Sequence, residues 1–348
     1  MLKEEENMKK FAAIVLSLLM VLTLVACGGS NTTTEAAKTV YKITYANTTA
    51  DANPQAINAK WLAERAKELS NGQLEITVFN NNKLGAFSDC FAQMQLPTGT
   101  VQMGDVSPAS VTQFSTAFTP YSLPFLFKNA QQSFDFFDKS DSVKKSEEEF
   151  LKETNVRVLG YFYNDARALT NGKKAVATPD DMKGLKLRVM TSDVYIKTFE
   201  SLGAAPVGMQ FSELFSALQT GTVDGQDNGL ILSMDSKFNE VQKYYTDLGH
   251  VQDTSVIFIS EEFWKTLPED LQKALQQAVD EAVAKERQEY LNKLDSYLTE
   301  MKKTMEVTIL TDAQRQAFKD ACQPVYDWYR GEFSQYDIDA IMADIAKY

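Results

Sequence analysis

The sequence of 348 residues is short of the side chains that most enzymes use, with a single histidine, His250, and three cysteines. A histidine-based zinc site needs several imidazoles, and a Ser-His-Asp or Cys-His device needs a well-placed one. Cys-x-x-Cys pairs, glycine-rich phosphate loops and Gly-x-Ser-x-Gly elbows are also missing. We therefore expect no metal, no cofactor and no enzymatic activity. An enzyme that works with carboxylates alone stays open as an alternative.

Positive charge is in short supply as well. The chain has 35 Lys and Arg against 47 Asp and Glu, which gives a net charge of −12 and a pI near 4.8. Binding to nucleic acid requires a basic face, so we expect no nucleic-acid partner. Any anion that the protein binds must be met by a local group of cations.

The apolar run from Phe11 to Ala26 is sixteen residues long, whereas a membrane-spanning helix needs about 20. Lys9 and Lys10 precede it and a small, polar stretch follows, which is the pattern of an export signal. We therefore predict a removed signal peptide over residues 1–26, with a retained membrane helix as the less favoured alternative. Because signal peptides are poor in acids, the three glutamates at 4–6 favour translation from Met8 over Met1.

The residues at the end of this run, Leu24 to Gly28, resemble a bacterial lipobox, in which the cysteine is lipidated and becomes the new N-terminus. Cys27 is therefore predicted to be a lipid anchor, which holds a protein stably when it carries two or more acyl chains. Residues 27–38 are rich in Ser, Thr, Asn, Ala and Gly, as in a flexible linker. The other cysteines, Cys90 and Cys322, could form a disulfide, but we favour two buried thiols.

Hydrophobic periodicity predicts alternating strands and helices. Residues 40–80 read as a strand, a helix and a second strand, and a similar run recurs in the second half. The elements expected there are strands at Leu185–Val189, Ala205–Val207 and Thr222–Asp224 and helices at Ser192–Leu202 and Phe211–Thr220. Two such units predict an α/β fold with two domains and a ligand site in the cleft between them.

Neither glycine nor proline occurs between Pro268 and Pro324, and apolar residues recur there at helical intervals. A helix from Pro268 to about Met305 would be roughly 55 Å long, longer than one domain of this size is wide. We expect it to pass behind both domains. Domain I is predicted to comprise residues 39–164 and about 252–292, and domain II residues 165–251 and about 293–348.

Arginine is scarce, with seven residues among the 35 Lys and Arg. Two of them, Arg167 and Arg188, fall near a strand end and on a strand of the predicted core. The planar guanidinium can meet a carboxylate with two parallel hydrogen bonds, which lysine cannot copy. From the pattern alone, an ordinary structural salt bridge is the favoured explanation of both arginines.

Residues 163–190, with Gly-Leu-Lys-Leu-Arg-Val at 184–189, resemble the extracytoplasmic solute receptors of TRAP transporters, the DctP family. The resemblance continues through 203–207 and 223–228 and covers nearly all of residues 40–305. It implies a two-domain, periplasmic-binding-protein-like fold that closes by a hinge, with a long helix spanning both domains. It also implies a receptor that delivers a small organic acid to the small and large integral membrane subunits of a TRAP transporter.

The same resemblance implies roles for six residues. In that family the arginine matching Arg188 binds the substrate carboxylate, and the positions matching Arg167 and Asn228 assist it. Phe211 would cover the apolar side of the ligand, while Asn47 and Ser107 would contribute from the other domain. His250 falls where many members have a histidine, and we interpret it as a hinge or core residue.

Two departures from the family pattern bear on the ligand. Gly229 replaces a usual proline, which predicts a looser loop. Receptors for sialic acid carry an acidic residue at two positions. Here the first position is Ala86 or Phe87 and the second is Ser107. We therefore expect a smaller acid: a sugar acid, a hydroxy or keto acid, or a dicarboxylate. The predicted location is outside the cytoplasmic membrane on a lipid anchor, and a receptor that feeds a sensor kinase is the rival function.

Overall fold

The structure, a computed structural model, describes residues 38–348. The expected signal peptide, Cys27 and the predicted linker up to residue 37 lie outside the described residues. None of the helices within 38–348 is both long and apolar enough to cross a bilayer.

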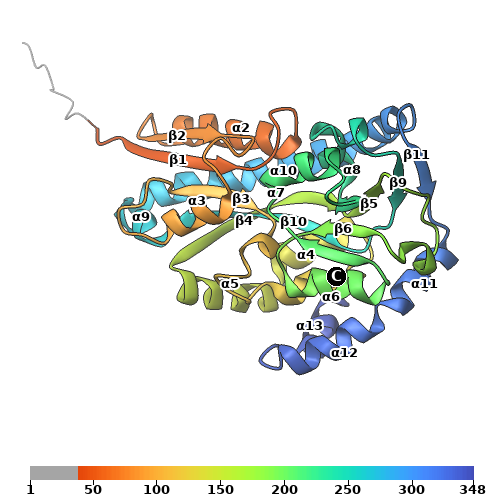
Figure 1. Ribbon diagram of the computed structural model, residues 1–348. Helices are drawn as coiled ribbons and strands as arrows, with labels where there is room; N and C mark the ends of the chain where they lie inside the picture. The colour runs from red at the N-terminus through yellow and green to blue at the C-terminus, as the bar shows by residue number, and fades with distance from the viewer. Residues whose placement is uncertain (1–37) are drawn as a thin grey trace, which may run out of the picture. The chain divides into compact units, whose positions relative to one another are not determined.

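The first sheet has five strands in the order β2-β1-β3-β10-β4 (Figure 1). β1 pairs in parallel with β2 and β3, and β10 runs antiparallel between β3 and β4. Ile43 and Tyr45 are buried, whereas Lys42 and Thr44 are more accessible, as the period of a strand requires. The strands are β1 (Tyr41–Asn47), β2 (Leu74–Phe79), β3 (Met103–Val106), β4 (Val156–Ala166) and β10 (Gln252–Ser260).

The second sheet has six strands in the order β11-β9-β5-β8-β6-β7. β6 pairs in parallel with both β7 and β8, whereas β5 runs antiparallel between β8 and β9. The two sheets confirm the predicted α/β fold. The strands are β5 (Ala168–Asn171), β6 (Lys186–Val189), β7 (Ala205–Gly208), β8 (Gly225–Asn228), β9 (Tyr244–Asp247) and β11 (Glu306–Ile309).

The strand expected at Thr222–Asp224 was placed wrongly, because β8 begins three residues later at Gly225. Its side chains Gln226, Asp227 and Asn228 are polar and nevertheless buried. Buried polar groups are tolerated where they are hydrogen-bonded, and Gln226 Nε2 donates to Thr170 Oγ1 at 2.9 Å. The strand is therefore held by polar partners, which hydrophobic periodicity does not detect.

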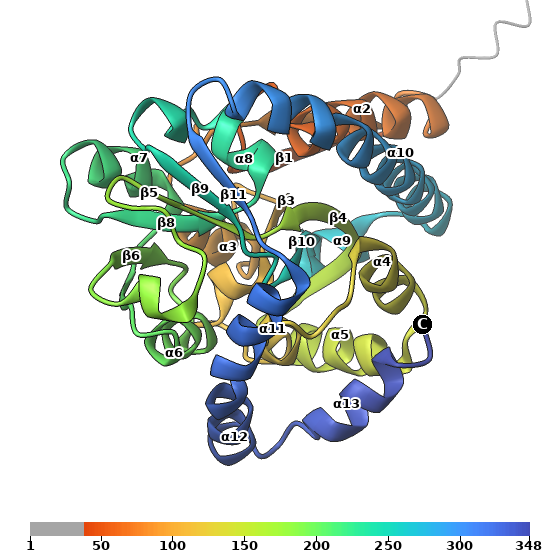
Figure 2. The same cartoon turned by 90° about the vertical axis from the view of Figure 1, so that its right-hand side faces the viewer.

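The helices cover both sheets, and the longest of them, α10 (Glu269–Met301, 33 residues), links the two (Figures 1 and 2). Its first half packs Leu271 and Leu275 into the core of the first sheet. Its second half packs Met301 against the second sheet. A helix of this length spans about 50 Å, so the predicted shared helix is confirmed. The other helices are α2 (Pro54–Leu69), α3 (Phe87–Met94), α4 (Ala130–Lys139), α5 (Asp141–Thr154), α6 (Asp193–Ser201), α7 (Phe211–Gln219), α8 (Leu230–Asp235), α9 (Glu261–Thr266), α11 (Asp312–Ala321), α12 (Gln323–Glu332) and α13 (Ile338–Ile345).

Two short segments carry the chain between the sheets beside α10. The first crosses at Arg167, between β4 and β5, and the second covers residues 248–251, between β9 and β10. They are hydrogen-bonded to each other, because Arg167 N donates to Val251 O at 2.8 Å and Gly249 N donates to Arg167 O at 2.9 Å. These crossings lie at the domain boundaries that we propose.

The last helix, α13, contacts both sides of the proposed division, which assigned residues 293–348 to domain II. Ile338 belongs to an apolar cluster on the second sheet's side, whereas Ile345 belongs to one on the first sheet's side. α13 lies beside α5 (Figure 2), and Ser140 and Ser142 at the start of α5 donate hydrogen bonds to Asp344. Gln132 of α4 donates to the carbonyl of Ile345 at 3.2 Å. The C-terminal end of the chain therefore packs on elements of the first sheet's side.

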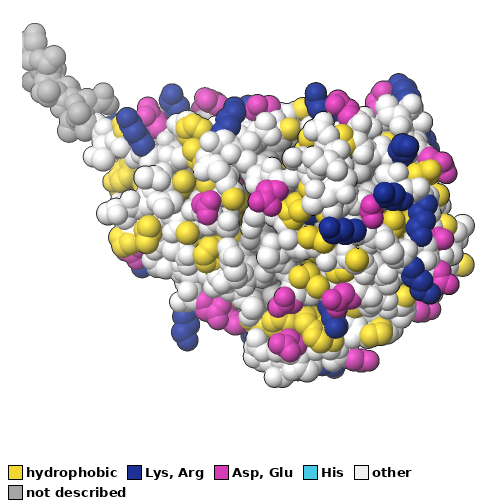
Figure 3. Space-filling view, in the orientation of Figure 1, with side chains coloured by type: hydrophobic (Ala, Val, Ile, Leu, Met, Phe, Trp, Pro, Cys, Tyr) yellow, Lys and Arg dark blue, Asp and Glu magenta, His cyan; other side chains and the backbone are white. Residues whose placement is uncertain are grey.

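Cys90 and Cys322 are both free and buried, which confirms the prediction of two thiols. They belong to different apolar clusters, one at each sheet. The charged side chains of both signs are spread over the face shown in Figure 3. The net negative charge is thus distributed there as ordinary solvated charge.

Candidate functional site

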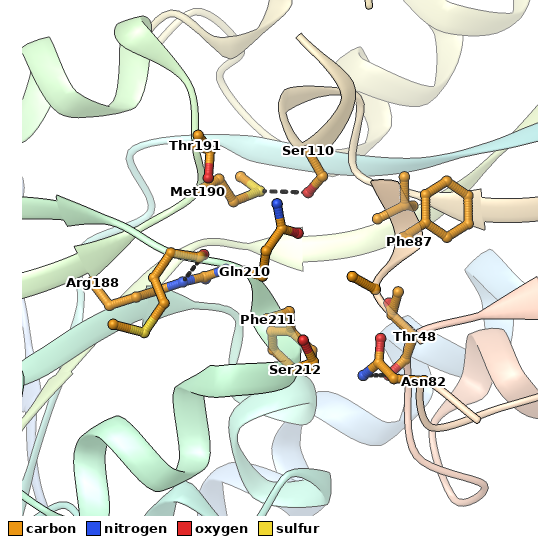
Figure 4. Close-up of a pocket in the computed structure, with 13 residues that line it drawn as sticks. Thr48, Asn82, Phe87, Ser110, Arg188, Met190, Thr191, Gln210, Phe211 and Ser212 are labelled. Carbon is orange, nitrogen blue, oxygen red and sulfur yellow. Dashed lines mark hydrogen bonds between the residues drawn. The ribbon is translucent and has the colours of Figure 1, made fainter. Parts of the chain in front are cut away.

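Two adjoining cavities, of about 20 Å³ and 30 Å³, lie between the two sheets. Their walls come from the residues at and after the carboxyl ends of β1 and β3 in the first sheet and β6, β7 and β8 in the second, where α/β sheets bind ligands. We call these two cavities together the chamber. Figure 4 shows Arg188 entering from one side, Phe87 and Thr48 on the other, and Gln210 reaching toward Ser110.

Arg188 lines both cavities although its side chain is only 2% exposed. It projects from β6, where its neighbours Leu187 and Val189 enter the apolar core. Its Nε donates to Met209 O at 2.9 Å, and its guanidinium carbon lies 5.9 Å from the centre of the Phe211 ring. Its Nη1 is buried without a hydrogen-bond partner among the described residues. The site thus contains a fixed cation with open donors.

The pKa of Arg188 is affected by its burial and by its lack of an ion-pair partner. Its pKa is lowered to about 10, chiefly by burial and also by the positive charge of Arg167, while Asp227 partly offsets the shift. No carboxylate within the described part of the chain forms an ion pair with it. At neutral pH the group is still protonated, so the fold maintains an unpaired buried positive charge, an arrangement that costs several kcal/mol.

Arg167 is buried completely, and four of its five N–H groups bond to the protein. Nε donates to Asp227 at 2.8 Å and Nη1 to Asp253 at 2.7 Å. Nη2 donates to the carbonyl oxygen of Asp227 and, at 3.0 Å, to Asn228 Oδ1. Since Asp227 lies on β8 and Asp253 on β10, this arginine ties the two sheets together at the crossing.

The carboxylates around Arg167 respond to its charge. Burial alone would raise the pKa of Asp227, but Arg167 and His250 lower it to below its usual value. Burial raises the pKa of Asp253, and Arg167 offsets part of that shift. His250 is fully buried, with Nε2 3.3 Å from Asp227 Oδ2 and Nδ1 3.2 Å from Arg167 O. It does not line the chamber, which fits the interpretation of a hinge or core residue.

The structure brings five of the six predicted site residues to the chamber. Ser107, Arg167 and Asn228 line the second cavity, while Phe211 lines both, as Arg188 does. Asn47 is the one that is set back.

Asn47 lines a separate small cavity, and its side chain braces the loop after β1. Its Oδ1 accepts from Thr49 N and Oγ1, each at 2.7 Å, and its Nδ2 donates to Asp105 at 2.7 Å. The neighbouring Thr48 takes the place in the chamber wall where Asn47 was expected.

Several neutral lining residues were not found from the sequence. They share a polar side chain, and most of them lie after a strand or in the first turn of the next helix, whereas Asn164 and Ser255 lie within β4 and β10. Such features are a weak signal on their own. Ala86 and Phe87, considered above as family positions, do line the first cavity. The additional polar residues are Thr48, Thr49, Gln55, Asn82, Ser110, Asn164, Thr191, Gln210, Ser212 and Ser255.

Gly229 follows Asn228, and the structure gives a different reason for glycine here than a looser loop. A Cβ on Gly229 would lie 2.2 Å from Asp165 Cβ and 2.6 Å from its Cγ. Asp165 itself has a left-handed backbone (φ 72°) and accepts from Ala166 N at 2.8 Å and Ile231 N at 3.3 Å. The loop is therefore packed tightly against the first crossing.

We expect Gly229→Ala to lower the stability by about 1–3 kcal/mol, the usual cost of overpacking, and to weaken ligand binding by displacing Asn228. The φ of −65° at Gly229 suits alanine, so the expected loss of stability comes mainly from the contact of the new Cβ with Asp165. Denaturant unfolding of a double-mutant cycle with Asp165→Gly tests this. The cost should shrink in the Asp165→Gly background, and an equal cost in both backgrounds would contradict the explanation.

Among residues 38–348, no group of three or more His, Cys, Asp or Glu side chains is arranged to hold a metal ion. The open polar groups of the chamber are the guanidinium of Arg188, one N–H of Arg167, hydroxyls and amides. Such a set suits an anion with several hydroxyl or carbonyl oxygens.

Comparison with known proteins gives similarities of three kinds: to a family model, to a relative in sequence and to solved structures. A family model described as bacterial extracellular solute-binding protein, family 7 (DctP), matches residues 45–332. The C4-dicarboxylate-binding periplasmic protein DctP of Shewanella loihica is 30% identical over 329 residues, covering 94% of this chain and 96% of that protein.

Solved structures are similar over the same extent. The sugar acid binding protein DctPAm of Advenella mimigardefordensis, in complex with galactonate, has a TM-score of 0.84 and 28% identity, covering 89% of this chain and 99% of that one. A TRAP periplasmic solute binding protein of Shewanella oneidensis with bound succinate has a TM-score of 0.82 and 28% identity, covering 88% and 99%. The similarities therefore include both sheets and α10.

Proposed function

Since the chain belongs to the DctP family of bacterial extracellular solute-binding proteins, we propose that it captures a small organic carboxylate between its two sheets and passes it to the membrane subunits of a TRAP transporter. The proposed ligand carboxylate lies against Arg188, with Asn228 and the fifth N–H of Arg167 beside it. Phe211 covers the apolar side of the ligand. Ser107 contributes from the first sheet, and Asn47 supports Thr48 from behind.

The observation that carries this proposal is the state of Arg188. A buried cation with an unpartnered Nη1 and no ion pair is costly, and such groups are typical of sites that receive an opposite charge from a ligand. Its open donors face the chamber, whose remaining lining is neutral apart from Arg167, and Arg167 is already paired with Asp227 and Asp253. A hydrogen bond to a charged group contributes about 1.5–3 kcal/mol, so two or three of them supply much of the roughly 8 kcal/mol of micromolar binding.

The ligand enters when the two sheets open at a hinge, and it is enclosed when they close again. The two cavities have room for only a few water-sized groups, so the sheets must separate to admit an organic acid. A wider depression of about 510 Å³ shares Thr48, Asn82, Phe211 and Ser212 with the chamber. We place the opening between these four residues, with the two crossings and α10 as the hinge.

A thermal-shift screen against sugar acids, hydroxy acids, keto acids and dicarboxylates, followed by calorimetry, tests the proposal. At least one acid should raise the melting temperature, and its methyl ester should not, because the ester has no charge for Arg188. Equal binding of ester and acid would contradict the carboxylate site. The ligand should be recovered unchanged, because we propose a receptor and not an enzyme.

We further propose that Cys27 is lipidated and tethers the receptor outside the cytoplasmic membrane, within reach of its transporter. In cells of a bacterium that processes lipoproteins, the wild-type chain should partition into detergent and incorporate labelled palmitate. Cys27→Ser should abolish the label and move the protein to the aqueous phase. Cys90→Ala is the control and should keep the label, and a labelled Cys27→Ser protein would contradict the anchor.

A further inference from the structure

Two serines on the first-sheet wall of the chamber are each backed by a buried carboxylate. Ser107 Oγ donates to Asp253 Oδ1 at 2.9 Å, and Ser255 Oγ donates to Asp105 Oδ2 at 2.8 Å. Both serines line the second cavity with Arg188, and both acids are at least 95% buried. The wall therefore consists of two hydroxyls, each with an acid directly behind it.

The acids decide which way the hydroxyls point. An ionised carboxylate can only accept hydrogen bonds, so each serine hydrogen is directed at its acid and the oxygen lone pairs are left for the chamber. Arg167 lies 2.7 Å from Asp253 and favours the carboxylate form of that acid against the effect of burial. Burial raises the pKa of Asp105 to about 6, and it is therefore mostly ionised at neutral pH. The wall thus accepts hydrogen bonds from a ligand.

Asn164 lines the same cavity and contacts the acid behind Ser107. Its Nδ2 donates to Asp253 Oδ2 at 2.9 Å, while its Oδ1 accepts from Gln55 Nε2 at 3.1 Å. One donor of Asn164 is thus already directed at the same acid. A ligand hydroxyl, which can donate, matches such a wall, whereas a ligand carboxylate has no proton to offer.

The balance of charge in the chamber is a second, independent reason to expect a ligand with hydroxyls and a single carboxylate. The charge of Arg167 is matched by Asp227 and Asp253, and Arg188 is the one arginine of the chamber without an ion pair in the described part of the chain. No lysine or histidine lines either cavity. The site therefore has a cation for one ligand carboxylate, while a second would meet lone pairs backed by buried negative charge.

Building on the proposed function, we propose that the receptor selects a polyhydroxylated monocarboxylate, with the Ser107–Asp253 and Ser255–Asp105 pairs as its specificity determinants. The carboxylate binds Arg188, and the hydroxyls donate to the two serines. Of the ligand classes that the sequence leaves open, this selects sugar acids and excludes dicarboxylates.

Calorimetry at pH 7.5 with acids that differ at one end tests the ligand class. Galactonate and galactarate share six carbons, and erythronate and meso-tartrate share four. In each pair the second acid has a carboxylate in place of the terminal alcohol. We expect the monocarboxylate of a pair to bind at least about tenfold more tightly. A preference for the dicarboxylate, or binding only of acids without hydroxyls, would overturn the specificity and leave the receptor function standing. If no organic acid binds at all, the proposed function itself fails.

Variants of the two pairs test the determinants. Ser107→Ala and Ser255→Ala should each weaken binding of the preferred acid about threefold to tenfold and lower the ratio of monocarboxylate to dicarboxylate affinity. Asp105→Asn should lower the ratio too, because an amide can donate to Ser255 and turn its hydrogen outward.

Ser110→Ala is the matched control for these variants. Ser110 also lines both cavities, but its hydroxyl faces Met190 Sδ at 3.4 Å and has no acid behind it. Its removal should change both affinities in similar proportion. The proposal would be overturned if the ratio of monocarboxylate to dicarboxylate affinity fell as much in Ser110→Ala as in Ser107→Ala and Ser255→Ala. It would also be overturned if none of the variants changed this ratio. Melting temperatures confirm that each variant is folded.

Discussion

Replacing Arg188 by methionine is expected to weaken binding of the carboxylate ligand by about a hundredfold or more while leaving the protein at least as stable as before. The loss follows from two charge-assisted hydrogen bonds of about 1.5–3 kcal/mol each. The stability should be kept or improved because the variant no longer buries an unpaired cation, which is costly in the wild type. Calorimetry with the acid found in the screen and thermal unfolding of the same preparation measure both effects.

Two further variants sharpen this test. Arg188→Lys keeps the charge but lacks the planar fork, and it should still lose about tenfold or more in affinity. Lys186→Met removes an exposed cation two residues earlier on β6 and should change neither property. Unchanged affinity in Arg188→Lys would contradict bidentate binding, and a large fall in melting temperature of Arg188→Met would show that the arginine is structural.

The helices and strands that were predicted correctly from the sequence are those whose apolar residues recur with the period of a helix or a strand. The strand with Ile43 and Tyr45, the helix α6 and the long helix α10 all place apolar side chains at regular intervals on a buried face. β8 was misplaced because its residues are polar, and a buried polar strand depends on partners that are far apart in sequence. The position of α13 has the same cause, since its contacts with Ser140 and Gln132 are tertiary.

The candidate site could be predicted only in part, for a similar reason. The residue pattern alone does not distinguish Arg167 from Arg188, because the carboxylates that pair with Arg167 lie 60 and 86 residues away. Only the family resemblance gave them different roles. The neutral wall around Thr48 and Ser110 gave no signal, as serine and threonine occur in most loops. The acids behind Ser107 and Ser255 likewise depend on pairing between β3 and β10.

Arg167→Leu is expected to destabilise the protein by about 3–5 kcal/mol, the opposite outcome to that of Arg188→Met. The change leaves Asp227 and Asp253 buried without their cation, and breaking a buried pair from one side has this cost. For a chain of this size the melting temperature should fall by about 10 °C. Arg330→Leu is the matched control, because Arg330 also pairs with two aspartates, but at the surface. It should cost no more than about 1 kcal/mol.

The pH dependence separates lost charge pairing from lost packing. In the wild type the pKa of Asp227 is lowered, so its contribution to stability is present above the unfolded pKa and is lost as the pH falls below it. In Arg167→Leu both carboxyls would be buried without a cation, which raises their pKa values. The folded variant then binds protons more tightly than the unfolded chain, and its stability rises as the pH falls. The deficit relative to the wild type should therefore be smaller at pH 5 than at pH 7.5, whereas lost packing would give the same deficit at both.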